Sequence, residues 1–188
     1  MANKKKGQLT ASSEWAKHLR KYLKKQFWKS ERKAENKEIE ASLFETDNLM
    51  WQFEELVKTL IAMSMPLEFQ KNYYGIGVAS DEMAGDFYSY YTLNKSRYKK
   101  RGLIIIETKE LLDNIEKFLE SWSNEKDEEF WYEMDKHEVE WDLLRSKAKN
   151  TLNNMNKSNL TIEVNHENEY DKNGNVVSQK TKTKLIEK

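Results

Sequence analysis

Apolar side chains follow a helical pattern in two separate stretches of the chain. In residues 49–64 they recur at intervals of three and four, as on the buried face of an α-helix. Pro66 is expected to end this helix, because proline cannot continue the backbone hydrogen bonding. A similar stripe in residues 111–122 predicts a second core helix, with Thr108 as its N-terminal cap.

A third core helix is predicted after residues 124–129, which form an acidic linker. From Phe130 to Thr151 the apolar or small positions alternate in steps of four and three, which is the a/d spacing of a helix–helix seam. His137 falls on this stripe. We therefore expect one long helix that begins at Phe130.

The segment between these helices has a different composition. Aromatic and β-branched residues cluster within residues 67–107, and glycines interrupt them. Residues 72–79, 87–93 and 103–107 are predicted to be three short antiparallel strands. The last of them lacks alternation and is typical of a strand buried on both faces.

The two ends of the chain carry patterns of their own. A basic amphipathic helix is predicted from a cap at Ser12 or Ser13 to a point beyond Arg32. At the other end, residues 160–170 and 176–186 alternate apolar and polar side chains on either side of an Asn-Gly turn. This pattern predicts a β-hairpin of low hydrophobicity.

The hairpin turn contains Tyr170, Asp171, Gly174 and Asn175. This pattern resembles the turn of the tyrosine–aspartate repeats in large bacterial secreted toxins. The resemblance covers only the turn, occurs once, and implies no activity. It favours a bacterial source.

Together these elements predict a predominantly helical α+β fold, with three core helices beside a small antiparallel sheet. We expect a basic amphipathic arm in residues 1–41, a mixed helical core domain in residues 42–157 and a polar C-terminal hairpin in residues 158–188. Aromatic residues are 12% of the chain, and each can bury a large apolar area, so a packed core is expected despite a mean hydropathy of −0.94.

Charge is segregated along the chain, although the formal net charge is zero. Residues 1–37 carry 12 basic and 3 acidic residues, whereas residues 110–142 carry 3 basic and 13 acidic ones. Two explanations stay open: the blocks pair with each other inside the fold, or one of them faces a charged partner. Because salt screens exposed charges over about 8 Å, a basic pole and an acidic pole can coexist.

Several kinds of chemistry have little support in the sequence. The chain has no cysteine, which excludes disulfides, thiolate nucleophiles and cysteine-based zinc sites. Its three histidines, His18, His137 and His166, do not accompany a nucleophile pattern. Glu133 precedes His137 by four positions rather than the three of di-iron bundles, and residues 74–80 lack the third glycine of a dinucleotide loop. We therefore expect no catalysis, cofactor or metal.

The remaining function class is binding through charged surfaces. We expect a protein partner with a basic surface, and one concrete version is a small bacterial inhibitor or toxin-immunity protein that blocks a nucleic-acid-handling partner. Acidic charge would steer association and aromatic rings would supply buried contacts. The predicted acidic face consists of Glu125, Asp127, Glu128, Glu129, Trp131, Tyr132 and Asp135.

The alternative is an RNA- or DNA-associated protein that uses the basic aromatic helix near the N-terminus. Lysine and arginine would contact phosphates, and an aromatic ring would stack on bases. An anionic membrane surface, an acidic groove or the chain's own acidic core are further possible neighbours of this helix. The candidate nucleic-acid-binding residues are Lys17, Arg20, Lys21, Lys24, Lys25 and Trp28.

The expected compartment is the cytoplasm. No apolar segment follows the first lysines as it would in a secretory signal, and no run of about 18 apolar residues is present. The lack of cysteine also suits a reducing environment.

Overall fold

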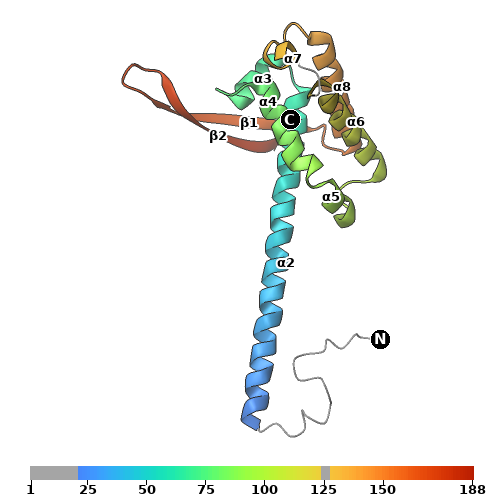
Figure 1. Ribbon diagram of the computed structural model, residues 1–188, viewed down its shortest axis with the longest axis vertical. Coiled ribbons are helices and arrows are strands. Elements are labelled where there is room, and N and C mark those ends of the chain that lie inside the picture. Colours follow the sequence, from blue (N-terminus) through green and yellow to red (C-terminus); the bar gives the residue numbers. More distant parts are fainter. Residues whose placement is uncertain (1–20, 124–127) are drawn as a thin grey trace. The chain divides into compact units, whose positions relative to one another are not determined.

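The computed structural model describes residues 21–123 and 128–188 (Figure 1). The chain divides into two units, Met1–Asn48 and Leu49–Lys188. Over the described ranges it is predominantly helical, with a two-stranded antiparallel sheet at the C-terminal end, which confirms the predicted α+β class. None of the helices in these ranges is both long and apolar enough to span a bilayer.

Helix α2, Lys21–Ser64, is longer than either helix predicted for this part of the chain. The predicted caps Ser12 and Ser13 lie outside the described residues. Thr46 and Asp47, just before the predicted core helix of residues 49–64, are helical as well. No glycine or proline occurs in this segment, so nothing in the backbone favours a break there. In the first unit, helical structure is described from Lys21 onward.

Three helices supply most of the core of the second unit, as predicted. They are the end of α2, then α6, Ile106–Ser123, and α8, Glu138–Asn154. Each fully buried large side chain contributes on the order of 1.5–3 kcal/mol. The buried apolar residues of these helices are Leu49, Leu56, Val57, Leu60, Ile61, Ala62, Met63, Leu112, Ile115, Leu119, Trp141, Leu144, Ala148 and Leu152.

The boundaries of α2 and α6 test two predictions. The last residue of α2 is Ser64, two positions before Pro66, as expected. The predicted cap of α6 is wrong, because the helix already begins at Ile106. Thr108 is buried in its first turn, where its hydroxyl donates a hydrogen bond to Oδ1 of Asn154 at 2.5 Å. This hydroxyl therefore joins α6 to α8 instead of capping α6.

The predicted long helix from Phe130 is two helices instead of one. Helix α7 covers Glu128–Tyr132, and α8 begins only at Glu138, with His137 in its N-cap position. Phe130 and Met134 are buried all the same. The apolar spacing identified the buried positions correctly but not the boundary, because a helix, a turn and a second helix can bury the same side chains.

The three strands predicted between residues 72 and 107 are wrong. That segment contains α3, Leu67–Tyr74, α4, Ala79–Phe87, the π-helical turn η1, Tyr88–Thr92, and α5, Lys95–Arg101. Phe87, Tyr91 and Tyr98 are buried at helical spacings of four and seven. Packing of these large rings against the core outweighs the weak preference of aromatic residues for strands.

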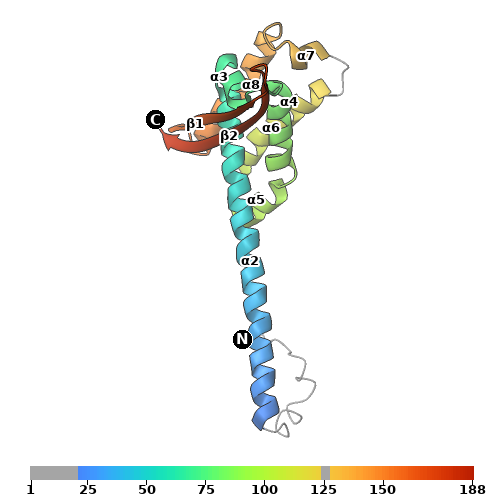
Figure 2. The ribbon, with the colours of Figure 1, turned by 90° about the vertical axis from the view of Figure 1, so that its left-hand side faces the viewer.

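The C-terminal hairpin is confirmed. Strand β1, Leu160–Tyr170, pairs antiparallel with β2, Val176–Glu187, in a register that sets Ile162 opposite Leu185. Ile162 is buried, and Leu160, Val164 and Leu185 pack against the helical core. Figures 1 and 2 both place the hairpin beside α3.

Polar contacts also attach the hairpin to the helices. The Nε2–H of His166 donates to the carbonyl oxygen of Asn72 at 2.6 Å, and the ring's Nδ1 lies 2.9 Å from the hydroxyl of Thr181. Oε1 of Gln179 accepts a hydrogen bond from the backbone N–H of Ile76 at 3.1 Å. Since an isolated two-stranded hairpin is marginal in water, these contacts stabilise its ordered state.

Replacing Gly75 with alanine is expected to detach the hairpin partly and to lower the free energy of unfolding by about 1–2 kcal/mol. Gly75 has φ +66, and a Cβ atom there would lie 1.6 Å from Oε1 of Gln179. The substitution therefore strains the backbone and displaces the acceptor of the Ile76 hydrogen bond. Urea denaturation and amide hydrogen exchange of β2 measure both effects.

A matched control is Gly85→Ala in α4, where a Cβ atom would meet no atom within 4 Å. In a helix interior this change is expected to be neutral or stabilising by up to about 1 kcal/mol. Equal behaviour of the two variants would contradict the Gly75–Gln179 contact.

Candidate functional site

The structure places the predicted acidic face only in part. Glu125 and Asp127 lie outside the described residues, and the side chain of Glu128, the first residue of α7, is not described. Glu129 and Asp135 are exposed. The predicted nucleic-acid-binding residues are described even less completely. The structure describes only the backbone of Lys21, Lys24, Lys25 and Trp28, which belong to α2. Lys17 and Arg20 lie outside the described residues.

The described members of the predicted face have different environments. Glu129 forms an ion pair with Lys136 at 3.0 Å. Trp131 is half-buried, with its ring centroid 5.1 Å from that of Phe130, and its carbonyl accepts a hydrogen bond from the hydroxyl of Ser80. Tyr132 is 63% exposed. Trp131 thus contributes to the core, whereas Tyr132 is available to a partner.

Asp135 lines a pocket of about 430 Å³ between the α2–α3 corner and the α7–α8 corner. Glu138 and Asp142 on α8 line the same pocket, and so does Glu68 from the first turn of α3. Sequence patterns did not reveal Glu68, because the fold brings it to Asp135 from a distant part of the chain. The other lining residues are Ser64, Pro66, Leu67, Met134, Arg145 and Lys149.

The charges of this acidic pocket are not balanced. Within the described ranges, Glu68, Asp135 and Glu138 form no ion pair with a lysine, arginine or histidine nitrogen. Asp142 pairs with Nη1 of Arg145. Four carboxylates and two cations line the pocket, so it attracts positive charge.

The Arg145 side chain has an unused donor. It is only 11% exposed, and its Nε is buried without a hydrogen-bond partner among the described residues. A buried N–H without an acceptor costs free energy, on the order of 1–3 kcal/mol.

Helix dipoles help the pocket to hold negative charge. Glu68 lies in the first turn of α3, and Glu138 lies in the first turn of α8. The N-terminal turn of a helix stabilises a nearby carboxylate by about 0.3–1 kcal/mol. The two helix N-termini therefore favour negative charge at the pocket.

His137 does not join this pocket as a metal ligand. Its ring centroid lies 5.7 Å from Phe130 and 5.9 Å from Trp122, and its Nδ1 is 4.0 Å from Glu140. In the part of the chain that the structure describes, no three histidine, aspartate or glutamate side chains are grouped to hold a metal ion. The ring of His137 packs at the edge of the aromatic cluster.

A second group of titratable residues lies beside the hairpin and has no signal in the sequence. Burial raises the pKa of Asp86 in α4 to about 6; the hydrogen bond from Tyr74 opposes this rise, and the charges of Glu82 and Glu55 add to it. The Tyr74 hydroxyl donates to Oδ2 of Asp86 at 3.3 Å. Burial also raises the pKa of Tyr73 above its usual range.

Lys58 lies close to this group and is 5% exposed. Its ammonium contacts Glu55 at 2.8 Å and Glu54 at 3.2 Å. Burial by itself would lower the lysine pKa, but the hydrogen bonds and charges of the two glutamates raise it above its usual value. Lys58 therefore compensates Glu55 inside the fold, and this group is a structural one.

The acidic pocket is the better candidate for binding, because three of its carboxylates form no ion pair within the described ranges and it is open to solvent. Its geometry suits recognition of a cationic group. No protein-family model, curated protein or solved structure matches this chain.

Proposed function

We propose that this chain is a non-catalytic binding protein that holds a basic segment of a protein partner in the acidic pocket. The observation that carries the proposal is the convergence of Glu68 with Asp135 and Glu138 without a paired cation in the described ranges. An arginine or lysine side chain of the partner would supply the positive charge. Charge-assisted hydrogen bonds of this kind are about twice as strong as neutral ones.

The size of the pocket fits this ligand. Its volume of about 430 Å³ lies in the usual range for sites that enclose a small ligand, so it has room for an arginine side chain. The guanidinium would bind the carboxylate oxygens that line the pocket.

The surroundings of the pocket favour a protein over a free cation. Val139 and Leu143 are 80% and 51% exposed, and they lie four residues apart on α8, next to the row of Glu138 and Asp142. Tyr132 is exposed nearby in sequence at the end of α7. Apolar and aromatic side chains beside charged ones are typical of protein interfaces.

Within this proposal the chain acts as an inhibitor, in the manner of a toxin-immunity protein, and its partner handles nucleic acid through a basic surface. The support is electrostatic, since residues 110–142 carry 13 acidic and 3 basic residues. Such an acidic surface accelerates association with a basic partner and makes it sensitive to salt.

Neutralising the pocket is expected to weaken binding of a basic probe by about tenfold or more. The variant is Glu68→Gln/Asp135→Asn/Glu138→Gln in the full chain. The probe is a short fluorescein-labelled peptide in which arginine and glycine alternate. Its binding is measured by fluorescence anisotropy at physiological salt. The expected loss arises because three carboxylates no longer compensate the bound guanidinium.

The matched control is Asp81→Asn/Glu107→Gln/Glu110→Gln, which removes the same number of charges from exposed positions outside the pocket. It should change the affinity by no more than about threefold. An equal loss in both variants would mean that the probe senses only overall charge, and the pocket would no longer be the proposed site.

A further inference from the structure

We propose that the open edge of β2 is a docking site for an extended segment of a protein partner in which acidic and apolar side chains alternate. The site does not depend on the acidic pocket, and its ligand has the opposite charge. The bound segment would add a third strand to the hairpin and extend over an apolar groove at its base.

The free edge of β2 is the first part of the site. Among residues 21–123 and 128–188 the sheet has two strands, so β2 pairs with β1 on one side only. In the described part of the chain, no main-chain group of another segment bonds to β2 from its other side. In Figure 1, β2 forms the lower edge of the hairpin. A long strand with free N–H and C=O groups is a template for strand addition.

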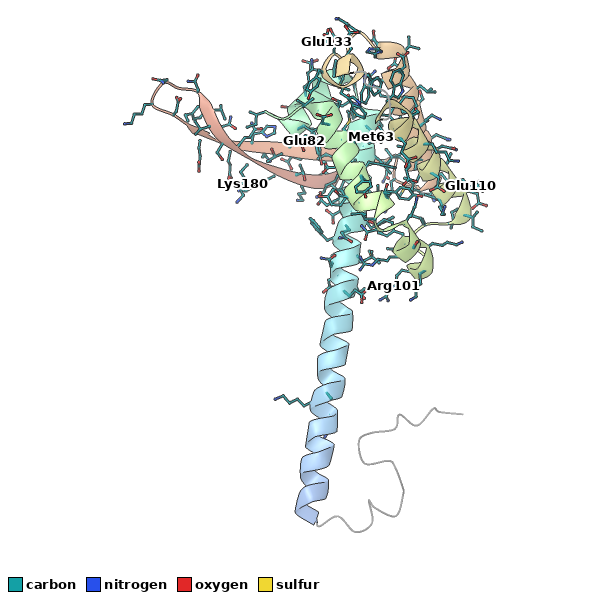
Figure 3. All side chains as sticks on the ribbon, viewed as in Figure 1. Met63, Glu82, Arg101, Glu110, Glu133 and Lys180 are labelled. Carbon is teal, nitrogen blue, oxygen red and sulfur yellow. The ribbon has the colours of Figure 1, made fainter. Side chains whose placement is uncertain are left out.

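Positive charge follows this edge. Lys180, Lys182 and Lys184 occupy every second position of β2 and are exposed, so they share one face of the sheet. Figure 3 shows Lys180 on the hairpin, apart from the helical core around Met63. Lys182 pairs with Glu167 of β1.

An added strand would place alternate side chains next to these lysines. Directly opposed residues on neighbouring strands have Cβ atoms about 4.5–5.5 Å apart, close enough for ion pairs. Acidic residues at alternate positions are therefore favoured. Two copies of the chain that paired β2 with β2 would set lysines against lysines, so the edge disfavours its own kind.

The groove at the base of the hairpin has a volume of about 430 Å³. Leu185, on the opposite face of β2 from the lysines, lines it together with Trp51 and Met50 of α2. These two α2 side chains are 51% and 48% exposed. The remaining lining residues are Phe53, Glu54, Val57, Lys157 and Leu160.

Edge and groove together specify the ligand. A strand added to β2 turns its residues alternately to the lysine face and to the face of Leu185. The first set meets cations, and the second set, near the base, meets apolar side chains. A segment in which acidic and apolar residues alternate matches both faces. A uniformly acidic peptide or a uniformly apolar one would match only one of them.

The hairpin is also rigid enough to serve as a template. In its turn, Oδ1 of Asp171 accepts hydrogen bonds from the backbone N–H groups of Asn173 at 2.8 Å and Asn175 at 2.9 Å. His166 and Gln179 fix the strands to the α3 region. A pre-ordered site binds more tightly, because less conformational entropy is lost on binding.

The test uses the full chain and a fluorescein-labelled peptide in which glutamate alternates with valine and leucine. The charge-reversal variant Lys180→Glu/Lys182→Glu/Lys184→Glu should bind this peptide about tenfold or more weakly. It should bind a second peptide, with lysine in place of glutamate, more tightly than the unaltered chain does. This rescue distinguishes a lost contact from a misfolded hairpin.

The matched control reverses three exposed cations of α5, Lys99→Glu/Lys100→Glu/Arg101→Glu, with the same change in net charge. It should change the affinity for the glutamate peptide by no more than about threefold. A loss equal to that of the β2 variant would show attraction by overall charge and would overturn the proposal.

Backbone pairing is tested with N-methylated glutamate peptides. In a peptide that pairs with β2, only every second backbone N–H points toward β2. Methylation of these N–H groups should abolish binding, and methylation of the alternate N–H groups should preserve it. Equal binding of both peptides would exclude strand addition. Sedimentation tests whether a second copy of the chain occupies the edge instead. If the full chain self-associates and the β2 variant does not, the occupant is a second copy, and the proposal is overturned.

Discussion

Replacing Phe130 with alanine is expected to lower the free energy of unfolding by about 3–5 kcal/mol. The Phe130 side chain is fully buried, and its ring is stacked between Trp122 and Trp141, with centroid distances of 4.2 and 4.6 Å. Alanine would leave a cavity between two indole rings that cannot both close on it. Urea denaturation followed by circular dichroism measures the loss.

The control is Tyr132→Ala on the same short helix. Its side chain is 63% exposed, so truncation removes little buried area and should cost less than about 1 kcal/mol. If Phe130→Ala costs no more than this control, the stacked arrangement of the three rings is incorrect.

Replacing Asp86 with asparagine is expected to stabilise the protein by about 2 kcal/mol at neutral pH and to have little effect below about pH 4. Burial raises the pKa of this carboxyl from 3.8 to about 6, so the folded state binds its proton more tightly than the unfolded state does. The contribution of Asp86 is complete below its unfolded pKa and is lost as the pH rises through about 6.

Asparagine does not ionise, and its side-chain oxygen can still accept the hydrogen bond from the Tyr74 hydroxyl. Urea denaturation at a series of pH values between about 4 and 8 measures the free energy of unfolding of the variant and of the unaltered chain. The difference between the two should grow as the pH rises. Asp81→Asn, at an exposed position of the same helix, is the control for removal of one carboxylate from α4. Parallel stability curves for Asp86→Asn would contradict the buried state of this carboxyl.

Sequence periodicity predicted the core helices well for a local reason. The buried residues of α2, α6 and α8 recur at helical spacing, and this spacing is written in the chain irrespective of its partners. The hairpin was predictable on the same grounds, because alternation and an Asn-Gly turn specify it. The boundaries at Thr108 and Phe130 were wrong, because contacts from other helices decide them.

The secondary structure of the segment from α3 to α5 could not be predicted from local sequence patterns. Phe87, Tyr91 and Tyr98 suit a strand by propensity, but they are buried as helical residues. Tyr98 packs on Phe53 of α2, and the Tyr91 hydroxyl donates to Asp113 of α6. Whether an aromatic-rich segment becomes sheet or helix depends on the surface that receives it. That surface is built by residues far away in the sequence.

The candidate sites divide in the same manner. Charge segregation in the sequence predicted an acidic surface that includes Asp135. That this surface binds a partner stays a prediction. Glu68 joined it only through the packing of α3 against the α7–α8 corner, and Asp86 lies beside Tyr74 only through the packing of α3 on α4.

The sequence by itself determined the helical faces, the hairpin and the separation of charge into blocks, because each depends on neighbours within a few residues. Only the tertiary structure decided which carboxylates meet in a pocket, which are buried, and which strand edge stays open. Those properties arise from contacts between distant segments, where burial and the distance to an opposite charge change the free energy of every ionised group.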